Sequence, residues 1–161
     1  DTEPYYVGTY SYAEDNGLYF FAGLEEEFED AFLDLLDMLS FSGIGGKRSS
    51  GYGRFEVMKM VPVPKERFAT TSSDKGYMLL SASLPKAEEM AQALENAEYL
   101  VEKRSGFVQS QSFLVARKKS EQYFLKAGSR FMHPFEGDIY VVSVGGEHPV
   151  YRYGKAMFWA L

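Results

Sequence analysis

The chain contains no cysteine among its 161 residues, so it can form neither a disulfide nor a thiolate metal site. Histidine is scarce as well. His133 and His148 are fifteen residues apart and each precedes a proline, which is not the ligand spacing of a zinc site. A metal would have to be held by carboxylates alone, and we expect the chain to carry neither a metal nor another cofactor.

Long hydrophobic runs are missing too. No apolar run approaches the roughly 20 residues that span a bilayer, and no basic segment followed by an apolar one opens the chain. We therefore expect a cytoplasmic protein that does not contact a membrane. Its 161 residues can bury the core of one domain.

Lysine and arginine are absent between Leu24 and Ser42, a stretch that carries seven acids. These acids account for more than the whole net charge of −6, so the negative excess, which would argue against nucleic acid if it were widespread, is local. Apolar residues recur there at intervals of three and four, which predicts an amphipathic helix with a buried stripe and the acids opposite. The stripe comprises Leu24, Phe28, Ala31, Phe32, Leu35, Leu36 and Leu39, and the acids are Glu25, Glu26, Glu27, Glu29, Asp30, Asp34 and Asp37.

The acidic face of this helix has two interpretations. Exposed helix surfaces are usually polar, so the face can simply be solvated. Alternatively it contacts a basic partner, and its charge would then also discourage RNA from binding on the wrong side. Charge reversal on this face separates the two interpretations, because only an interface would lose assembly.

The segment after the helix, residues 43–55, reads GIGGKRSSGYGRF and contains no acid. Four of its glycines fit the spacing GxGxxxxxGxG, and glycine permits positive φ and a close approach of backbone to a ligand. The cations supply charge for phosphate, and Tyr52 supplies a flat ring on which a base can stack. A flexible connector is the alternative, but it needs neither spaced glycines nor cations without acids. We therefore predict a ligand-binding loop, called the glycine loop below, with RNA contacts from Gly43, Gly45, Gly46, Lys47, Arg48, Ser49, Ser50, Gly51, Tyr52, Gly53 and Arg54.

Two other segments carry clustered cations. Residues 148–161 read HPVYRYGKAMFWAL, in which Arg152 and Lys155 alternate with apolar side chains. A strand with one face in the core explains the apolar residues and leaves the cations unexplained. The run Arg117, Lys118 and Lys119 follows a predicted strand, and cations at a strand end usually form a solvated edge that prevents aggregation, so this run is not part of the predicted site.

The glycine loop resembles that of the RAMP proteins of CRISPR systems, which has the same spacing. Taken with the closing segment, it is similar to the fourth Csm subunit of type III-A interference complexes, and the two segments cover about a sixth of the chain. The resemblance implies an α+β, ferredoxin-like (RRM-like) RAMP domain with a mainly antiparallel sheet. Because family members have two such domains in tandem, we expect the C-terminal half of a two-domain protein.

The resemblance also implies a function. It predicts a non-catalytic subunit that grips the 5′ tag of crRNA and contacts the large polymerase-like subunit and the backbone RAMP subunit. It further implies that the closing segment returns beside the glycine loop, which adds Arg152, Tyr153 and Lys155 as secondary RNA contacts. Two alternatives stay open: a RAMP-type endoribonuclease that processes CRISPR RNA, with His133 as the candidate acid or base, and a protein that makes only protein contacts.

The order of predicted elements agrees with one α+β domain over residues 1–161. We expect a glycine-loop unit (1–61), a loop (62–75) and a remaining sheet with the closing segment (76–161). The first two predicted strands are joined by the turn Glu14-Asp15-Asn16-Gly17, whose Asn-Gly pair favours a hairpin. Strands are predicted over residues 5–12, 18–22, 55–61, 77–84, 99–108, 111–117, 122–127 and 139–144, and a second helix over 85–96.

Overall fold

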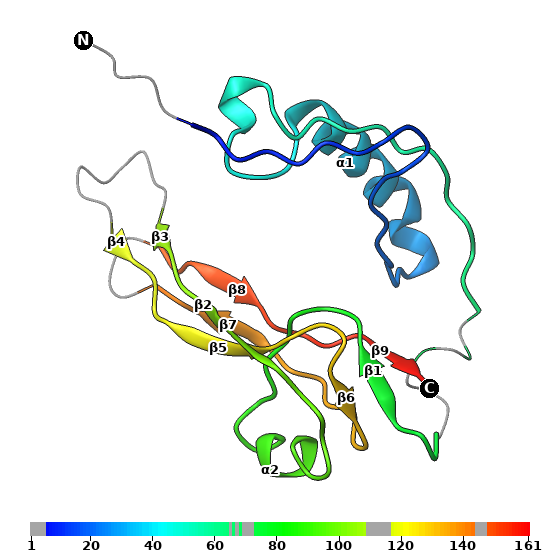
Figure 1. The fold of residues 1–161 in the computed structure, drawn as a ribbon, viewed down its shortest axis with the longest axis vertical. Coiled ribbons are helices and arrows are strands. Elements are labelled where there is room, and N and C mark those ends of the chain that lie inside the picture. The colour runs from blue at the N-terminus through cyan, green and yellow to red at the C-terminus, as the bar shows by residue number, and fades with distance from the viewer. Residues whose placement is uncertain (1–5, 65, 67, 69–72, 109–116, 144–147) are drawn as a thin grey trace. The chain divides into compact units, whose positions relative to one another are not determined.

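The computed structural model describes residues 6–64, 66, 68, 73–108, 117–143 and 148–161. The chain folds as two compact units, Asp1–Val61 and Pro62–Leu161, called unit 1 and unit 2 below. Figure 1 shows the elements of each unit with their labels. A single domain over residues 1–161 stays a prediction.

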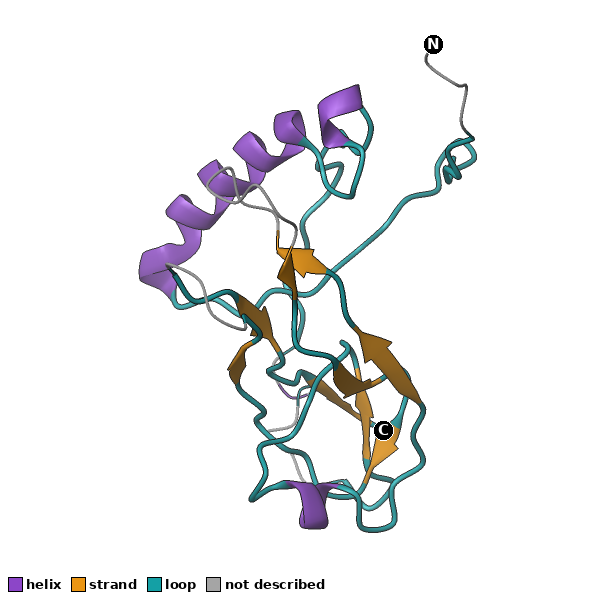
Figure 2. Ribbon diagram, turned by 90° about the vertical axis from the view of Figure 1, so that its left-hand side faces the viewer, coloured by secondary structure: helices purple, strands orange, loops and turns teal. Residues whose placement is uncertain are grey.

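Unit 1 is built around one long helix. The helix α1 spans Glu29–Ser42 and follows a single 3-10 turn, η1, at Glu26–Phe28; Figure 2 shows both in purple. Acids occupy the first turn of each, where the positive end of the helix dipole favours negative charge. Gly43 ends α1, and its amide donates to the carbonyl of Leu39 at 2.7 Å. The predicted helix is confirmed, although its regular α-helical part begins at Glu29.

The predicted apolar stripe of α1 is only partly buried. Leu36 is buried and Phe32 is half-buried, but Leu35 and Leu39 are exposed. A helix stripe is buried only where a second element covers it. In the described part of unit 1, cover comes from Phe20, whose ring lies 6.4 Å from that of Phe32, and from the segment that follows the glycine loop.

The three strands expected in unit 1 do not occur in its described residues. Residues 6–12, 18–22 and 55–61 run without strand pairing, and Tyr5 lies outside the described residues. A turn does form within the predicted residues 14–17, at Glu14-Asp15, with a φ of 63° at Asp15, but the described segments on either side of it do not pair as a hairpin. The predictions were wrong because alternating side chains favour an extended backbone, whereas a strand also requires a partner that completes the ladder of hydrogen bonds.

The core of unit 2 is a three-stranded antiparallel sheet with strand order β6-β1-β9. Tyr77 in the central strand pairs with Phe131 on one side and with Ala160 on the other. The rings of Phe131, Phe135 and Phe158 pack edge to face, with centroids 5.1 to 5.7 Å apart. Such pairs contribute about 0.5–1.5 kcal/mol each beyond the area they bury. The strands are β1 (Tyr77–Leu79), β6 (Arg130–Phe131) and β9 (Phe158–Ala160).

Three further antiparallel ladders complete the described sheets of unit 2. Two backbone contacts connect them to their surroundings. Ser83 forms a bridge with Leu125, which joins the segment after β1 to β5, and the amide of Ser120 donates to the carbonyl of Val142 at 2.8 Å. The ladders pair β2 (Val101–Arg104) with β5 (Gln122–Leu125), β3 (Phe107–Val108) with β4 (Arg117–Lys118), and β7 (Ile139–Val141) with β8 (Tyr151–Tyr153).

Several predicted elements of unit 2 are confirmed, but shorter. The helix expected over 85–96 is α2, Met90–Ala93, and is preceded by a turn. The strand expected over 99–108 is divided into β2 and β3, and Gly106, with a φ of 131°, lies between them. The strands β1, β5 and β7 fall within predicted ranges, and β6 was not predicted. Most of the range 111–117 lies outside the described residues.

Candidate nucleic-acid interface

The two ends of the glycine loop meet at a neck. The amide of Ile44 donates to the carbonyl of Gly53 at 2.9 Å, directly after Gly43 has ended α1. Beyond the neck, the amide of Phe55 lies 3.3 Å from the carbonyl of Ser40 and ties the outgoing chain to the last turn of the helix. Residues 45–52 therefore project as a closed loop from a fixed base.

Gly43 and Gly53, the outermost glycines of the motif, are required by the neck itself. A Cβ atom on Gly53 would lie 1.9 Å from the carbonyl oxygen of Ile44, and one on Gly43 would lie 2.9 Å from the carbonyl carbon of Gly53. Both residues also have positive φ, 82° and 79°. Gly43 thus approaches the backbone of Gly53, and Gly53 approaches that of Ile44, so the neck itself requires both glycines; that they also approach a ligand stays a prediction.

The inner glycines have a different environment. Gly45 and Gly51 adopt φ of 97° and 83°, and a Cβ atom on either would meet open space. Gly46 has neither a positive φ nor a close neighbour. The amides of Gly45 and Gly46 donate to no backbone carbonyl among the described residues, so they are available to an anion.

The tip of the loop is a single 3-10 turn, η2 (Arg48–Ser50), which Gly51 ends in the left-handed conformation. The amide of Tyr52 lies 3.3 Å from the carbonyl of Lys47, which folds the tip back on itself. The side chains of Lys47, Arg48 and Tyr52 are exposed, with 49% of Tyr52 accessible. Ser49 and Ser50 are exposed beside them. The tip thus presents cations, hydroxyl groups and one phenol ring to solvent.

The electrostatics of the loop favour an anionic ligand. Arg48 and Arg54 are exposed, and neither pairs with a carboxylate in the described part of the chain. The loop leaves the C-terminal end of α1, where the helix dipole favours cations and does not itself attract an anion. Anion binding here would depend on the arginines and the loop amides.

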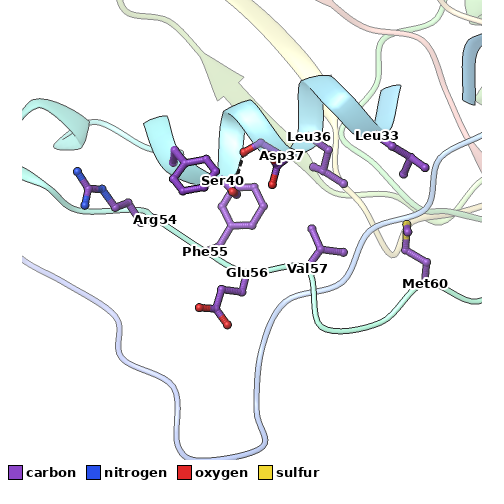
Figure 3. A pocket seen from close by; sticks show the side chains of 10 residues that line it. Leu33, Leu36, Asp37, Ser40, Arg54, Phe55, Glu56, Val57 and Met60 are labelled. Atoms are coloured by element: carbon purple, nitrogen blue, oxygen red, sulfur yellow. Dashed lines mark hydrogen bonds between the residues drawn. The ribbon is translucent and has the colours of Figure 1, made fainter. Parts of the chain in front are cut away.

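An apolar cavity lies beside the base of the loop. It forms between α1 and the segment that follows the loop, and Figure 3 shows Arg54 at one end of it and Met60 at the other. Leu36 and Val57 point into it, and the hydroxyl of Ser40 donates to the carbonyl of Asp37 at 2.7 Å. Its lining is mostly aliphatic and aromatic, so it suits packing rather than phosphate binding.

In the closing segment, Arg152 makes hydrogen bonds within unit 2. Its guanidinium donates to the carbonyls of Arg104 (2.8 Å) and Ser105 (3.3 Å) and to the side-chain oxygen of Gln122 (3.2 Å). Burial, with a smaller contribution from the charge of Arg104, lowers the pKa of Arg152 below its usual value. Tyr153, by contrast, is 67% exposed.

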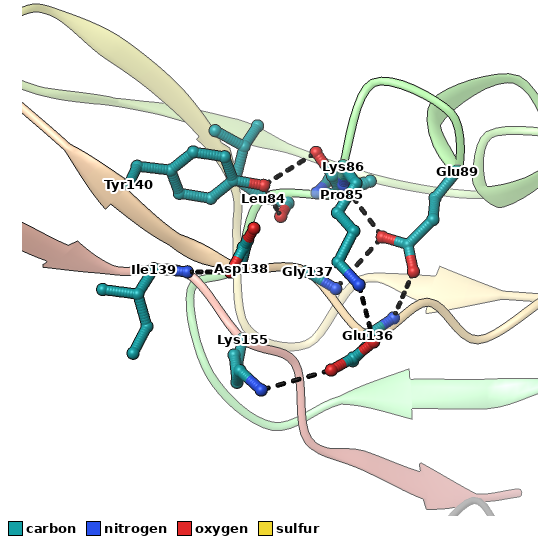
Figure 4. Close-up of polar contacts among 10 residues, drawn as sticks. All are labelled: Leu84, Pro85, Lys86, Glu89, Glu136, Gly137, Asp138, Ile139, Tyr140 and Lys155. Atoms are coloured by element: carbon teal, nitrogen blue, oxygen red, sulfur yellow. Dashed lines mark hydrogen bonds and ion pairs between the residues drawn. The ribbon is translucent and has the colours of Figure 1, made fainter.

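The side chain of Lys155 also has a partner within unit 2, as Figure 4 shows. Its ammonium lies 3.2 Å from one oxygen of Glu136, whose other oxygen lies 2.6 Å from Lys86. These two lysines, Lys86 first, hold the pKa of Glu136 below its usual value. Burial alone would raise the pKa of neighbouring Glu89, but hydrogen bonds from the amides of Lys86, Glu136 and Gly137 lower it.

Residues 72–161 match the family described as the CRISPR Csm4 C-terminal domain, which is more than half of the chain. The chain belongs to the CRISPR Csm4 family. Residues 2–56, which include the glycine loop, match the RAMP superfamily. The α+β ferredoxin-like RAMP fold expected from the sequence is thereby confirmed, with antiparallel pairing in every described ladder.

Curated Csm4 relatives align with the whole chain. The "CRISPR system Cms protein Csm4" of Mycobacterium tuberculosis, in strains CDC 1551 / Oshkosh and ATCC 25618 / H37Rv, is 39% identical over 165 residues. The protein of the same name from Streptococcus thermophilus is 35% identical over 164 residues. Each alignment covers 100% of this chain and 52 to 53% of the relative. The chain thus spans about half the length of the curated relatives it matches.

The Csm4 match extends over a junction that the sequence analysis missed. A Cβ atom on Gly137 would lie 2.3 Å from the carbonyl oxygen of Gly154, and one on Gly154 would lie 2.7 Å from the ring of Tyr140. The hydroxyl of Tyr140 donates to the carbonyls of Leu84 (2.7 Å) and Pro85 (3.0 Å). The Tyr-Gly-Lys sequence of the closing segment therefore locks β8 against β7. The pairing of Gly137 with Gly154 had no local sequence signal.

His133, the candidate for catalysis in the endoribonuclease alternative, lies in unit 2 with Nε2 3.7 Å from a carboxylate oxygen of Glu95. Among the described residues, no group of three or more histidine, aspartate or glutamate side chains is arranged to hold a metal ion. None of the described helices has both the length and the apolar character needed to cross a bilayer. The approach of the closing segment to the glycine loop stays a prediction, as do the RNA contacts themselves.

Proposed function

We propose that the chain is an RNA-binding, scaffolding part of a type III-A CRISPR effector complex, in which the glycine loop holds the 5′ tag of crRNA. The observation that carries the proposal is the pair of exposed arginines, Arg48 and Arg54, on a loop with a fixed neck and no carboxylate paired with either among the described residues. Membership in the Csm4 family supports a role in a CRISPR complex.

The binding mode follows from the chemistry of the loop. Arginine donates two parallel hydrogen bonds to a phosphate, and the amides of Gly45 and Gly46 add donors of fixed direction. The ring of Tyr52 offers a face to one base, an interaction typical of single-stranded RNA recognition. Arg152, Tyr153 and Lys155 are secondary contacts in this proposal. Of these, Tyr153 requires no rearrangement, whereas Arg152 and Lys155 would first leave their partners in unit 2.

The proposal includes the setting of the protein. The partners are crRNA, the large polymerase-like subunit and the backbone RAMP subunit, and the place of action is the cytoplasm. The chain itself carries out no catalysis. The exposed acids of η1 and α1, such as Glu26 and Asp30, give the scaffolding role a surface that suits a basic protein partner.

The experiment compares binding of labelled crRNA with and without the 5′ tag across a salt series. We expect the triple variant Lys47→Ala/Arg48→Ala/Arg54→Ala to lose tag-dependent affinity. Its salt slope should shrink by roughly 0.7 for each lost phosphate contact on a single strand. The matched control is Lys59→Ala/Lys75→Ala/Lys126→Ala, which removes three exposed cations outside the loop. Equal loss in both triple variants, or no loss in either, would contradict the proposal.

A further inference from the structure

A second cavity, in unit 2, combines aromatic rings with a lysine and a histidine. It has a volume of about 570 Å³, within the range of ligand pockets. Its lining includes Phe107 from β3 and Tyr151 from β8, together with Lys119 and His148. Neither the glycine loop nor the hydrogen-bonded side chain of Arg152 takes part in it.

Three backbone hydrogen bonds bring these residues together. The amide of Lys119 donates to the carbonyl of Gly106 at 2.8 Å, which places Lys119 at the end of the β3·β4 ladder beside Phe107. The amide of Ser120 donates to the carbonyl of Val142, and the amide of Val142 donates to the carbonyl of Val150 at 2.8 Å. These bonds join the end of the β3·β4 ladder to the end of the β7·β8 ladder, and the cavity is lined by residues from both.

The rings that line the cavity are not covered by the described residues. Phe107 and Tyr151 are each 60% exposed. The apolar surface continues along the same face of the β7·β8 ladder, where Val141 lies opposite Tyr151 and Ile139 lies opposite Tyr153, all of them exposed. On the opposite face, Tyr140 and Arg152 fasten the ladder to its neighbours, so the exposed face is rigidly presented.

The charges around the cavity favour a nucleic acid over a protein. Among the described residues, those that line the cavity include no carboxylate, and Lys119 forms no ion pair with another described residue. The described acid nearest to Lys119 in sequence, Glu121, is engaged by Lys103 at 2.7 Å and by Lys118 at 2.5 Å. An aromatic cavity with a cation on its rim matches a base attached to a phosphate, and a duplex would not offer an unstacked base.

We propose that this cavity binds one nucleotide of a single-stranded RNA, with the base stacked against Phe107 and Tyr151 and the phosphate near Lys119 and His148. The inference rests on the proposed function in one respect, because it takes the same class of ligand, RNA. The site is nevertheless separate from the glycine loop, since it belongs to unit 2 and has its own lining.

The test uses the full chain and a labelled oligouridine about 12 nucleotides long, a length typical of single-strand sites. Replacing Tyr151 or Phe107 with alanine should weaken binding roughly 5- to 150-fold, the range for the loss of one base stack. Tyr151→Phe keeps the ring and should bind like the wild type. Lys119→Ala should lower the salt slope by about 0.7. The control is Tyr123→Ala, which removes a ring that is 59% exposed outside the cavity.

Photo-crosslinking of the same RNA containing 4-thiouridine separates this inference from the proposed function. Crosslinks to Tyr151 or Phe107 that disappear in the alanine variants support the cavity, whatever happens at Tyr52 in the glycine loop. Wild-type affinity in the folded Phe107→Ala and Tyr151→Ala variants, or crosslinks confined to the loop, would overturn it. Loss of subunit assembly with unchanged RNA binding would also overturn it, because the occupant would then be a protein.

Discussion

The glycine loop of unit 1 and the closing segment of unit 2 both carry cations beside glycine and tyrosine, yet they use them differently. In the loop, Arg48 and Arg54 are exposed and pair with no carboxylate among the described residues. In the closing segment, Arg152 donates to backbone carbonyls and Lys155 pairs with Glu136. The same residue types therefore present charge to solvent in the loop and connect strands in the closing segment. Which of the two roles a cation takes depends on partners distant in sequence.

The largest effect is expected at the neck of the loop. Gly53→Ala places a Cβ 1.9 Å from the carbonyl oxygen of Ile44 at a φ of 82°, and backbone strain alone contributes about 1–3 kcal/mol. We expect the loop to lose its closed form and tag-dependent RNA binding to fall at least as far as in the triple cation variant. Gly23→Ala is the matched control, since Gly23 lies outside the glycine loop and its Cβ meets open space. Hydrogen exchange of the amide of Ile44 reports the neck directly, and an unchanged rate would refute the prediction.

The next largest effect is expected on the stability of unit 2, from substitution of Arg152, and it is compared with substitution of Arg48. Arg152→Ala removes hydrogen bonds from a charged donor, which should lower the free energy of unfolding of unit 2 by about 2 kcal/mol. Arg48→Ala should leave stability within about 0.5 kcal/mol, as at an ordinary surface site, while weakening RNA binding. Urea unfolding and RNA titration of both variants form a two-by-two comparison. The contrast between the regions fails if Arg152→Ala impairs RNA binding at wild-type stability.

The carboxylates of unit 2 predict a dependence on pH. The pKa of Glu89 is held below its ordinary value of 4.5 because three backbone amides donate to its ionised form. The unfolded chain therefore takes up this proton first as pH falls. The stabilisation is fully present above about pH 4.5 and is lost as pH falls through the folded-state pKa. Glu89→Gln should flatten the stability profile as pH falls below about 4.5, because the variant has no carboxylate to protonate at this position. Glu88→Gln, at an exposed neighbour, should leave the slope unchanged.

A smaller loss of stability is expected from reversing single charges on the helix α1. Asp30→Lys places a cation in the first turn of α1, where it opposes the helix dipole and should cost about 0.3–1 kcal/mol. Asp34→Lys, near the middle of the helix, should cost less. If the acidic face contacts a basic subunit, both variants should also weaken assembly in a pull-down with the other subunits. Normal assembly in both would leave the face as solvated surface.

No effect on RNA is expected at His133, whose neighbour is Glu95 at 3.7 Å. His133→Ala should bind tagged crRNA as the wild type does. Incubation of wild type and variant with a CRISPR precursor RNA gives the decisive comparison. Cleavage by the wild type that disappears in the variant would support the endoribonuclease alternative.

The sequence predicted α1 and its end at Gly43 well because their determinants are local, and the RNA contacts of the glycine loop stay a prediction. The intervals of the apolar residues specify the helix, and Gly43 specifies its end. The sequence-based prediction was wrong for the strands expected in unit 1. Alternation of side chains was visible there, but the existence of a pairing strand had to be assumed. Likewise, nothing near Lys155 in sequence announces Glu136, and nothing near Gly154 announces Gly137. Contacts between distant residues decide which cations stay exposed, so the closing segment could not be assigned by motif alone.

The neck at Ile44 and Gly53 has a consequence for how such loops can vary. Because one hydrogen bond and two glycines fix where the chain leaves and rejoins the base, the intervening residues can change in identity without altering the path of α1 or of the segment after Phe55. The segment between Gly43 and Gly53 could be replaced by the corresponding segment of another RAMP protein, which should transfer the ligand preference of that segment. Substitutions at exposed tip positions such as Ser49 should therefore leave the neck closed, whereas substitutions of Gly43 or Gly53 should open it.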